Sequence, residues 1–174
     1  VRGRWKRSRS AGNGVGAGLI RSPIVRDRVD SVFGDRRIQQ AFTYISDHES
    51  EIEADQLRLT QIPAPPFGEA AHARQFSAEL TNLQLEAATD SIGNVIASYD
   101  GFGRNPLIIG AHLDTIFPSS TRLQLERRGQ SLFLPGISDN GAGIVALLWA
   151  LRAAKAADLS FRRPVIAVGN VGEE

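Results

Sequence analysis

The stretch Ile108-Ile-Gly-Ala-His112-Leu-Asp114-Thr115 decides the fold, because an apolar strand runs directly into a histidine and a carboxylate two residues apart. Residues i and i+2 of a strand share one face, so His112 and Asp114 are expected side by side at the strand end. A neutral imidazole there can bind a metal while the carboxylate holds its other ring nitrogen. One His-x-Asp is a weak signal, and its weight comes from the segments that follow.

Two later segments also carry acidic groups at the mouth of a regular element. Residues 138–143 read Ser-Asp-Asn-Gly-Ala-Gly and open an apolar helix expected over 143–157, with Asp139 and Asn140 as candidate caps. Residues 164–171 predict a second buried strand that leads into Gly172-Glu173-Glu174. Strands separated by a helix point to a βαβ crossover with parallel pairing, and ligands of such sheets bind beyond the carboxyl ends of the strands.

The rest of the chain predicts an α/β fold around these strands. Residues 35–59 have near-helical apolar spacing with a break at Asp47-His48, and residues 69–83 predict a further helix with His72 on its outward or flanking face. The prolines of residues 62–67 indicate a stiff loop. Short strands are expected at 83–87 and 94–99, a hairpin at 123–134, and a core position for Trp149. The expected architecture is a mostly parallel sheet flanked by helices, with the hairpin added.

Composition is that of a globular protein. The chain has 174 residues, of which 42% are hydrophobic and 22% charged, so one principal domain is expected. The sequence contains no cysteine, so any metal must be held by histidine and carboxylates, and a cytoplasmic setting is favoured. No apolar run approaches the roughly 20 residues that a membrane-spanning helix needs.

The start of the chain is strongly basic. Its first thirty residues carry eight basic and two acidic side chains, a net charge of +6, which leaves −5 for the remainder. Such a segment can be a nucleic-acid arm, a targeting peptide or an unstructured leader. No aromatic or helical pattern supports a groove-binding element, so we expect residues 1–34 to be a disordered leader and no nucleic-acid partner.

One histidine with several carboxylates suits Zn²⁺ or a related divalent ion, and a carboxylate that bridges two such ions would create a hydrolytic centre. Four stretches together resemble the catalytic domain of the co-catalytic zinc exopeptidases, which include carboxypeptidase G, tripeptide aminopeptidase and related dipeptidases and deacylases. The resemblance covers residues 35–174. It rests on Ile62-Pro-Ala-Pro-Pro-Phe-Gly68, Gly110-Ala-His112-Leu-Asp114-Thr, Asp139-Asn-Gly-Ala-Gly143 and Gly172-Glu-Glu174.

The resemblance implies a role for each matching residue. His112 would bind one metal ion, Asp114 would orient its imidazole, and Asp139 would bridge both ions. Glu174 would bind the other ion, and Glu173 would act as general base. The implied ions are two Zn²⁺, with Co²⁺ or Mn²⁺ as alternatives, and the implied substrate is a peptide or an N-acyl amino acid.

The chain also departs from the family pattern. A further acidic ligand, an inserted dimerisation domain and a late histidine would follow Glu174 in the family. We therefore expect residues 35–174 to be the amino-terminal part of a metallopeptidase that binds metal weakly or is inactive as it stands. A homodimer is expected only through the absent domain, and no membrane partner is expected.

Two alternatives stay open. One is the related zinc aminopeptidase family of secreted and vacuolar enzymes, which also uses His-x-Asp, Asp-Asn-Gly and Glu-Glu. The proline-rich loop at 62–68 and the turn at 90–95 favour the first family. The other alternative is a non-enzymatic protein, either an inactive remnant or a nucleic-acid binder that uses its basic arm.

Overall fold

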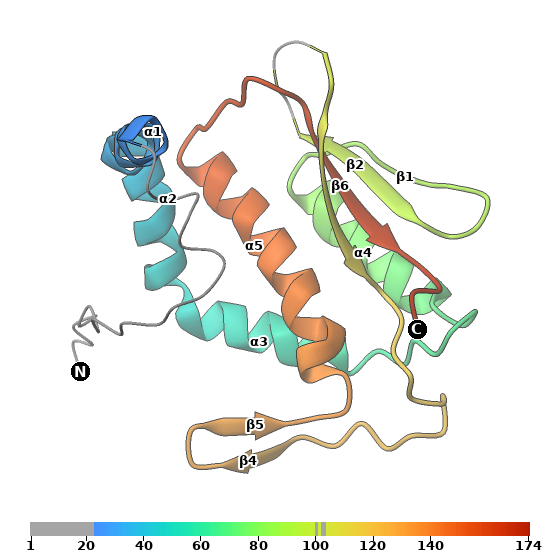
Figure 1. Cartoon of the computed structure of the whole chain (residues 1–174). Coiled ribbons are helices and arrows are strands. Elements are labelled where there is room, and N and C mark those ends of the chain that lie inside the picture. Colours follow the sequence, from blue (N-terminus) through green and yellow to red (C-terminus); the bar gives the residue numbers. More distant parts are fainter. Residues whose placement is uncertain (1–22, 100, 102–103) are drawn as a thin grey trace. The chain divides into compact units, whose positions relative to one another are not determined.

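The computed structural model describes residues 23–99, 101 and 104–174 (Figure 1). The chain divides into two compact units, residues 1–36 and 37–174. The first unit is described over residues 23–36, where helix α1 spans Pro23–Gly34 and has no buried residue. The leader expected at residues 1–34 therefore lies outside the described residues up to residue 22, and its last twelve residues are helical.

The helices of the second unit follow the predicted pattern closely. Helix α2 spans Arg36–Asp47 and α3 spans Glu49–Thr60, so the predicted break at Asp47-His48 is confirmed. Two glutamates in the first turn of α3 and Arg58 in its last turn complement the helix dipole. After the proline-rich loop, α4 covers Ala70–Asn82, and α5 covers Gly143–Ala156.

The main sheet has the strand order β1-β2-β6-β3. Strands β1 (Ala87–Thr89) and β2 (Val95–Tyr99) form an antiparallel hairpin, and β2 is also antiparallel to β6 (Val165–Asn170). Strand β3 (Leu107–His112) pairs with β6 in parallel, as the βαβ prediction required. The α/β class is confirmed, but the sheet is mixed rather than mostly parallel, because the β1–β2 hairpin attaches to β6 in the antiparallel sense.

A second, two-stranded sheet confirms the predicted added hairpin. It is formed by β4 (Glu126–Arg128) and β5 (Ser131–Phe133), joined through Gly129 and Gln130. Gly129 has a positive φ of 60°, which a tight hairpin turn accommodates most easily with glycine.

One core joins helices α3, α4 and α5 to a single face of the main sheet. Val95, Ala97 and Tyr99 of β2 are buried there together with Val165 and Ala167 of β6. Phe76 and Leu80 of α4 belong to the same cluster, and so do Leu148 and Trp149 of α5, which confirms the predicted core position of Trp149. In Figure 1, α4 lies behind β1 and β2, the strands it contacts.

The prediction that β3 is buried on both faces is wrong. Its first four residues are exposed, and only Ala111 is buried, with His112 partly covered. The reason is topological: β3 lies at the edge of the described sheet and has a strand neighbour on one side only. In this structure β3 and β6 still end side by side, so both carboxyl ends meet at one edge. No helix among the described residues is long and apolar enough to span a membrane.

Candidate metal centre

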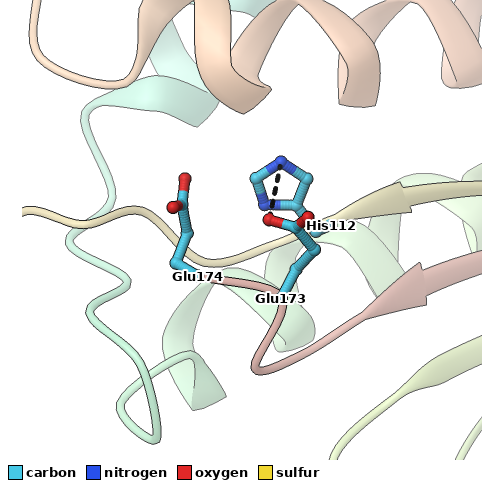
Figure 2. A group of neighbouring side chains, drawn as sticks. All are labelled: His112, Glu173 and Glu174. Carbon is cyan, nitrogen blue, oxygen red and sulfur yellow. Dashed lines mark ion pairs between the residues drawn. The ribbon is translucent and has the colours of Figure 1, made fainter.

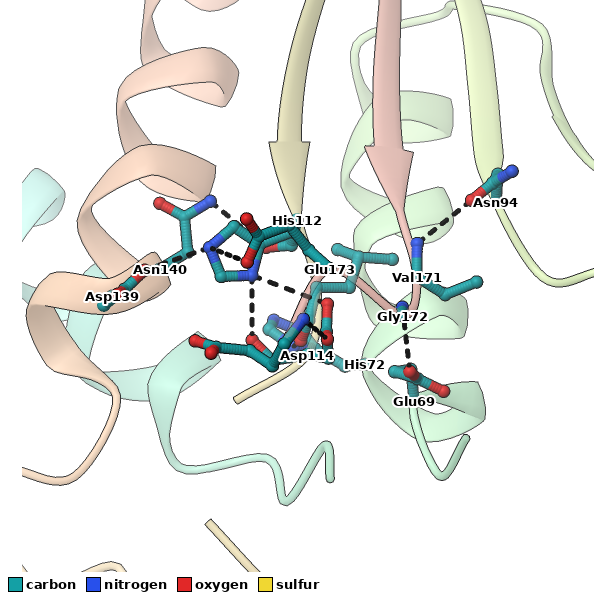
Figure 3. Close-up of polar contacts among 12 residues, drawn as sticks. Glu69, His72, Asn94, His112, Asp114, Asp139, Asn140, Val171, Gly172 and Glu173 are labelled. Atoms are coloured by element: carbon teal, nitrogen blue, oxygen red, sulfur yellow. Dashed lines mark hydrogen bonds and ion pairs between the residues drawn. The ribbon is translucent and has the colours of Figure 1, made fainter. Parts of the chain in front are cut away.

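His112 and the two glutamates come from the ends of neighbouring strands. His112 is the last residue of β3 and stands opposite Asn170, the last residue of β6. Glu173 and Glu174 follow three and four residues later. Figure 3 shows the resulting cluster beyond the arrowheads of both strands, where an open α/β sheet places its ligands.

Asp114 connects the two strand ends from below the imidazole. Its side chain is fully buried, with 0% exposure, and its Oδ1 lies 3.5 Å from Nδ1 of His112. The same Nδ1 is 3.1 Å from the backbone oxygen of Asp114. The other carboxylate oxygen, Oδ2, accepts the backbone N–H of Glu174 at 2.9 Å. Asp114 therefore holds the histidine ring and the glutamate segment in one arrangement.

Acidic groups gather around the other ring nitrogen. Nε2 of His112 is 3.0 Å from Oδ1 of Asp139 and 3.9 Å from Oε2 of Glu173. Figure 2 shows the carboxylates of Glu173 and Glu174 on the same side of the chain as the imidazole. One ligand atom each from His112, Glu173 and Glu174 lies within 4.8 Å of the others. Asp139 touches His112 but is outside this group of three.

The donor set fits a divalent cation. Both nitrogens of His112 face oxygen acceptors, so the ring needs either a second proton or a cation at Nε2. Among the described residues no lysine or arginine forms an ion pair with Asp139, Glu173 or Glu174. Oδ1 of Asp114 is buried and has no hydrogen-bond partner, which suits a carboxylate that faces an imidazole bound to a metal.

An irregular turn, Ile137–Ala142, presents Asp139 to the histidine. Asp139 has an extended backbone, with φ −119° and ψ 98°, between two tight glycine positions. A Cβ on Gly141 would lie 2.1 Å from Oγ1 of Thr60, so only glycine fits against α3 there. The predicted capping of α5 by Asp139 and Asn140 is wrong, because α5 has no side-chain cap and Asn140 instead donates to the backbone oxygen of His112 at 3.3 Å.

Two side chains that the sequence reasoning missed hold the segment before Glu173. Oδ1 of Asn94 accepts the N–H of Val171 at 3.0 Å, and Oε1 of the buried Glu69 accepts the N–H of Gly172 at 3.2 Å (Figure 3). Both contacts join residues far apart in the sequence, so no local pattern announced them. Their effect is to fix the strand end from which the two glutamates project.

His72 lies elsewhere than expected. It is buried, with 3% exposure, and its Nδ1 is 2.8 Å from the backbone oxygen of Leu113, between His112 and Asp114. The predicted outward or flanking face is wrong, because α4 packs this side of its surface onto the end of β3. Burial lowers the pKa of His72 below its ordinary value of 6.5, against the opposing effect of the Leu113 contact. The third histidine, His48, is half-buried and stacks on Tyr44 at 4.1 Å between ring centroids.

The structure thus brings together all five residues singled out in the sequence. His112, Asp114, Asp139, Glu173 and Glu174 share one edge of the sheet, joined by the contacts given above. Both glutamates are near His112, and Asp139 contacts it from the turn Ile137–Ala142. These distances are equally compatible with a metal ligand and with a general base. The roles of the five residues stay predictions.

Comparison with known families gives one match. Residues 94–174 match the model of peptidase family M28, a segment that contains every residue of the candidate metal centre. A comparison with curated proteins finds no match.

Solved structures share the fold. Aminopeptidase PepT from Bacillus cereus has a TM-score of 0.61 and 19% identity, over 70% of this chain and 36% of its own. A tripeptidase from Staphylococcus aureus has a TM-score of 0.62 and 19% identity, over 72% of this chain and 37% of its own. Human carnosine dipeptidase 1 has a TM-score of 0.61 and 16% identity, over 76% of this chain and 34% of its own.

The chain therefore spans about a third of the length of these structures. At such identities the likeness concerns the fold alone. Residues 94–174, somewhat less than half of the chain, resemble peptidase family M28, and the described fold is that of solved peptidase structures.

Proposed function

We propose that the protein contributes the metal centre of a hydrolase that cleaves peptide or N-acyl amide bonds at a chain terminus. The observation that carries this proposal is the convergence of three carboxylates on the imidazole of His112. His112, Asp139 and Glu174 would hold two Zn²⁺ ions, and Co²⁺ or Mn²⁺ are alternatives. When bound, such ions polarise the scissile carbonyl and make a water acidic enough to attack it.

The remaining residues would position groups and move a proton. The backbone oxygen of Asp114 accepts from Nδ1 of His112, with the carboxylate of Asp114 close by at 3.5 Å, and this leaves the lone pair of Nε2 directed at the acidic cluster. The carboxylate of Glu173 accepts a proton from the attacking water and returns it to the leaving nitrogen. Adjacent side chains diverge at a strand end, so Glu174 can bind metal while Glu173 stays free for this transfer.

We further propose that the working enzyme is longer than this chain. The matched structures are about twice its length, and the centre as described offers few protein ligands for two ions. The 174-residue chain by itself would then bind metal weakly and turn over no substrate. The same proposal predicts a homodimer formed through a further domain. It also predicts a cytoplasmic location and no nucleic-acid partner.

A second candidate is a catalytically inactive remnant of such an enzyme. This candidate is favoured because the chain covers only about a third of the matched structures. Such a remnant would keep the fold without completing the metal centre. Zinc binding alone does not separate the two candidates, because a remnant can retain ligands. Activity of a version that continues beyond Glu174 does separate them.

The test of the assigned roles compares two neighbouring glutamates. In a version extended beyond Glu174, Glu173→Gln is expected to keep its zinc and lose activity by about 10²–10⁴-fold, the usual contribution of a general base. Glu174→Gln is expected to lose zinc as well, as measured by metal analysis after dialysis. Undiminished turnover of Glu173→Gln would rule out its role as base, and zinc retention by both variants would remove Glu174 from the ligands.

A further inference from the structure

A pocket of about 700 Å³ adjoins the segment that carries the two glutamates. Its walls come from the start of α4, the β1–β2 turn and the two residues before Glu173. The residues that carry the argument are Phe67, Glu69, Arg74, Ile92 and Gly172. This volume lies within the range of small-molecule sites, about 300–1,000 Å³.

The walls of this pocket are tied to the candidate metal centre. Glu69 accepts the N–H of Gly172, and Asn94, next to the turn residue Gly93, accepts the N–H of Val171. Gly172 is bonded directly to Glu173. A ligand seated in the pocket would therefore lie against the segment that positions the proposed base.

Two large apolar side chains stand exposed at this pocket. Phe67 is 97% exposed and Ile92 is 72% exposed. Phe67 also has a positive φ of 64°, in the left-handed region that is unfavourable for a residue with a side chain. Its conformation is held by a turn in which Gly68 donates to Pro65 at 2.8 Å and the N–H of Phe67 donates to Glu69 at 2.9 Å. Strain and exposure together mark a side chain that is presented to a ligand.

The charge of the pocket selects the ligand further. Arg74 lines it, is exposed, and has no ion pair or hydrogen bond among the described residues. The acidic lining residue, Glu69, is already engaged by two backbone N–H groups through Oε1. A guanidinium without a protein partner beside apolar side chains is complementary to a carboxylate on an apolar body.

We propose that this pocket binds the carboxyl-terminal side of the substrate: an apolar residue with a free carboxylate, which Arg74 pairs with while Phe67 and Ile92 cover its side chain. This inference rests on the proposed function and refines it, because it favours a terminal carboxylate over a terminal amine as the recognised group. The substrate class is that of acylated or peptide-linked apolar amino acids with an unblocked carboxyl end.

The test measures the binding of three small probes to the 174-residue chain. Binding is monitored by ¹⁵N NMR titration, with the backbone signals of Gly93 and Gly172 as local reporters. N-acetylphenylalanine carries the carboxylate, N-acetylphenylalaninamide lacks it, and phenylalaninamide offers an ammonium instead. The acid is expected to bind at least about threefold more tightly than either amide, the scale of one exposed charge pair.

Three variants complete the design. Two of them each remove one positive charge, and the third fills the pocket. Arg74→Gln is expected to remove the preference for the acid, while Arg162→Gln, a change at an exposed arginine outside the pocket, keeps it. Ala70→Trp, at an exposed lining position, is expected to block all three probes. Circular dichroism checks that each variant is folded.

Several results would overturn the inference: no saturable shift with the acid, preference for phenylalaninamide, or an unchanged preference in Arg74→Gln. Shifts that depend on protein concentration rather than on the probe would assign the pocket to a second copy of the chain. Titrations with and without Zn²⁺ separate this inference from the proposed function. Probe binding by the 174-residue chain, with no zinc bound by the version extended beyond Glu174, would defeat the metal centre alone. Zinc bound by that extended version, without probe binding by either, would defeat the pocket alone.

Discussion

Phe67 shows how a single residue can be held in a costly conformation by its neighbours. Its φ of 64° belongs to the left-handed region, where Cβ crowds the backbone. The hydrogen bond from Gly68 to Pro65 and the hydrogen bond from Phe67 to Glu69 hold the backbone there. The ring of Phe67 is exposed, so burial of the side chain does not offset the cost. The local cost is therefore not repaid within the described fold.

Phe67→Gly is expected to raise the free energy of unfolding by about 0.5–1 kcal/mol, because the relief of strain exceeds the entropy that glycine adds to the unfolded chain. Urea unfolding measures this. Phe67→Ala is the matched control, since it removes the ring but keeps a Cβ at positive φ. Both variants should weaken binding of N-acetylphenylalanine. A glycine variant no more stable than the alanine variant would show that the backbone is not strained.

At the scale of elements, helices α3, α4 and α5 are joined by a network of charges. Asp55 of α3 accepts from Arg58 at 2.7 Å, from Trp149 at 3.1 Å and from Arg152. Glu79 of α4, which is buried, accepts from the same two arginines at 2.8 and 2.7 Å. The network satisfies carboxylates that are largely removed from water and so fixes how the three helices pack.

The pH dependence of stability follows from Asp55. Burial opposes its ionisation, but the hydrogen bonds and charges of Arg58 and Arg152 prevail, so its pKa lies below the ordinary 3.8. A lowered carboxyl pKa means that the stabilisation is present above pH 3.8 and is lost as the pH falls through the folded-state value.

Asp55→Asn is expected to lower the free energy of unfolding by about 1–3 kcal/mol at pH 7, because it weakens bonds to charged donors. The difference from the parent protein should shrink as the pH falls below 4, as followed by urea unfolding at each pH. Asp47→Asn, at an exposed position, should change stability by less than about 0.5 kcal/mol. A difference that grows toward acid pH would contradict the assigned sign.

At the scale of the whole molecule, the described sheet has one covered face and one sparsely covered face. Ile96 and Ile108 project on the side opposite the core and are 38% and 64% exposed. They lie beside the partly buried Ile166 and Val168 of β6, and β3 also leaves its outer edge unpaired. An apolar sheet face next to an open edge favours association with another surface.

Ile108→Lys is therefore expected to reduce self-association of the 174-residue chain, measured by light scattering or sedimentation over a range of concentrations. A charge on an edge strand opposes pairing with a second strand. Ile24→Lys, at an exposed site in α1, is the control for the added charge itself. Equal scattering from Ile108→Lys and the parent protein would show that this face does not mediate association.

The sequence by itself predicted most of the elements and proposed the residues of the site, but it did not predict helix α1, which lies where a disordered leader was expected. Periodicity placed helices α2 to α5, the β4–β5 hairpin and strands β2, β3 and β6, because apolar spacing directly reflects which side of an element is buried. The strand predicted at 83–87 is wrong, because β1 begins only at Ala87. The His112, Asp114, Asp139 and Glu173-Glu174 motifs lie at element ends, where side-chain direction follows from local geometry. These features depend on neighbours within a few residues, so they can be predicted from the sequence.

Tertiary structure alone decided the contacts that join distant segments. The inward position of His72, the bonds from Glu69 and Asn94 to the residues before Glu173, and the exposure of β3 all depend on which surfaces meet. Asn140 binds His112 rather than capping α5 for the same reason. Such contacts link residues 28 to 103 positions apart, and their energy belongs to packing rather than to any local preference.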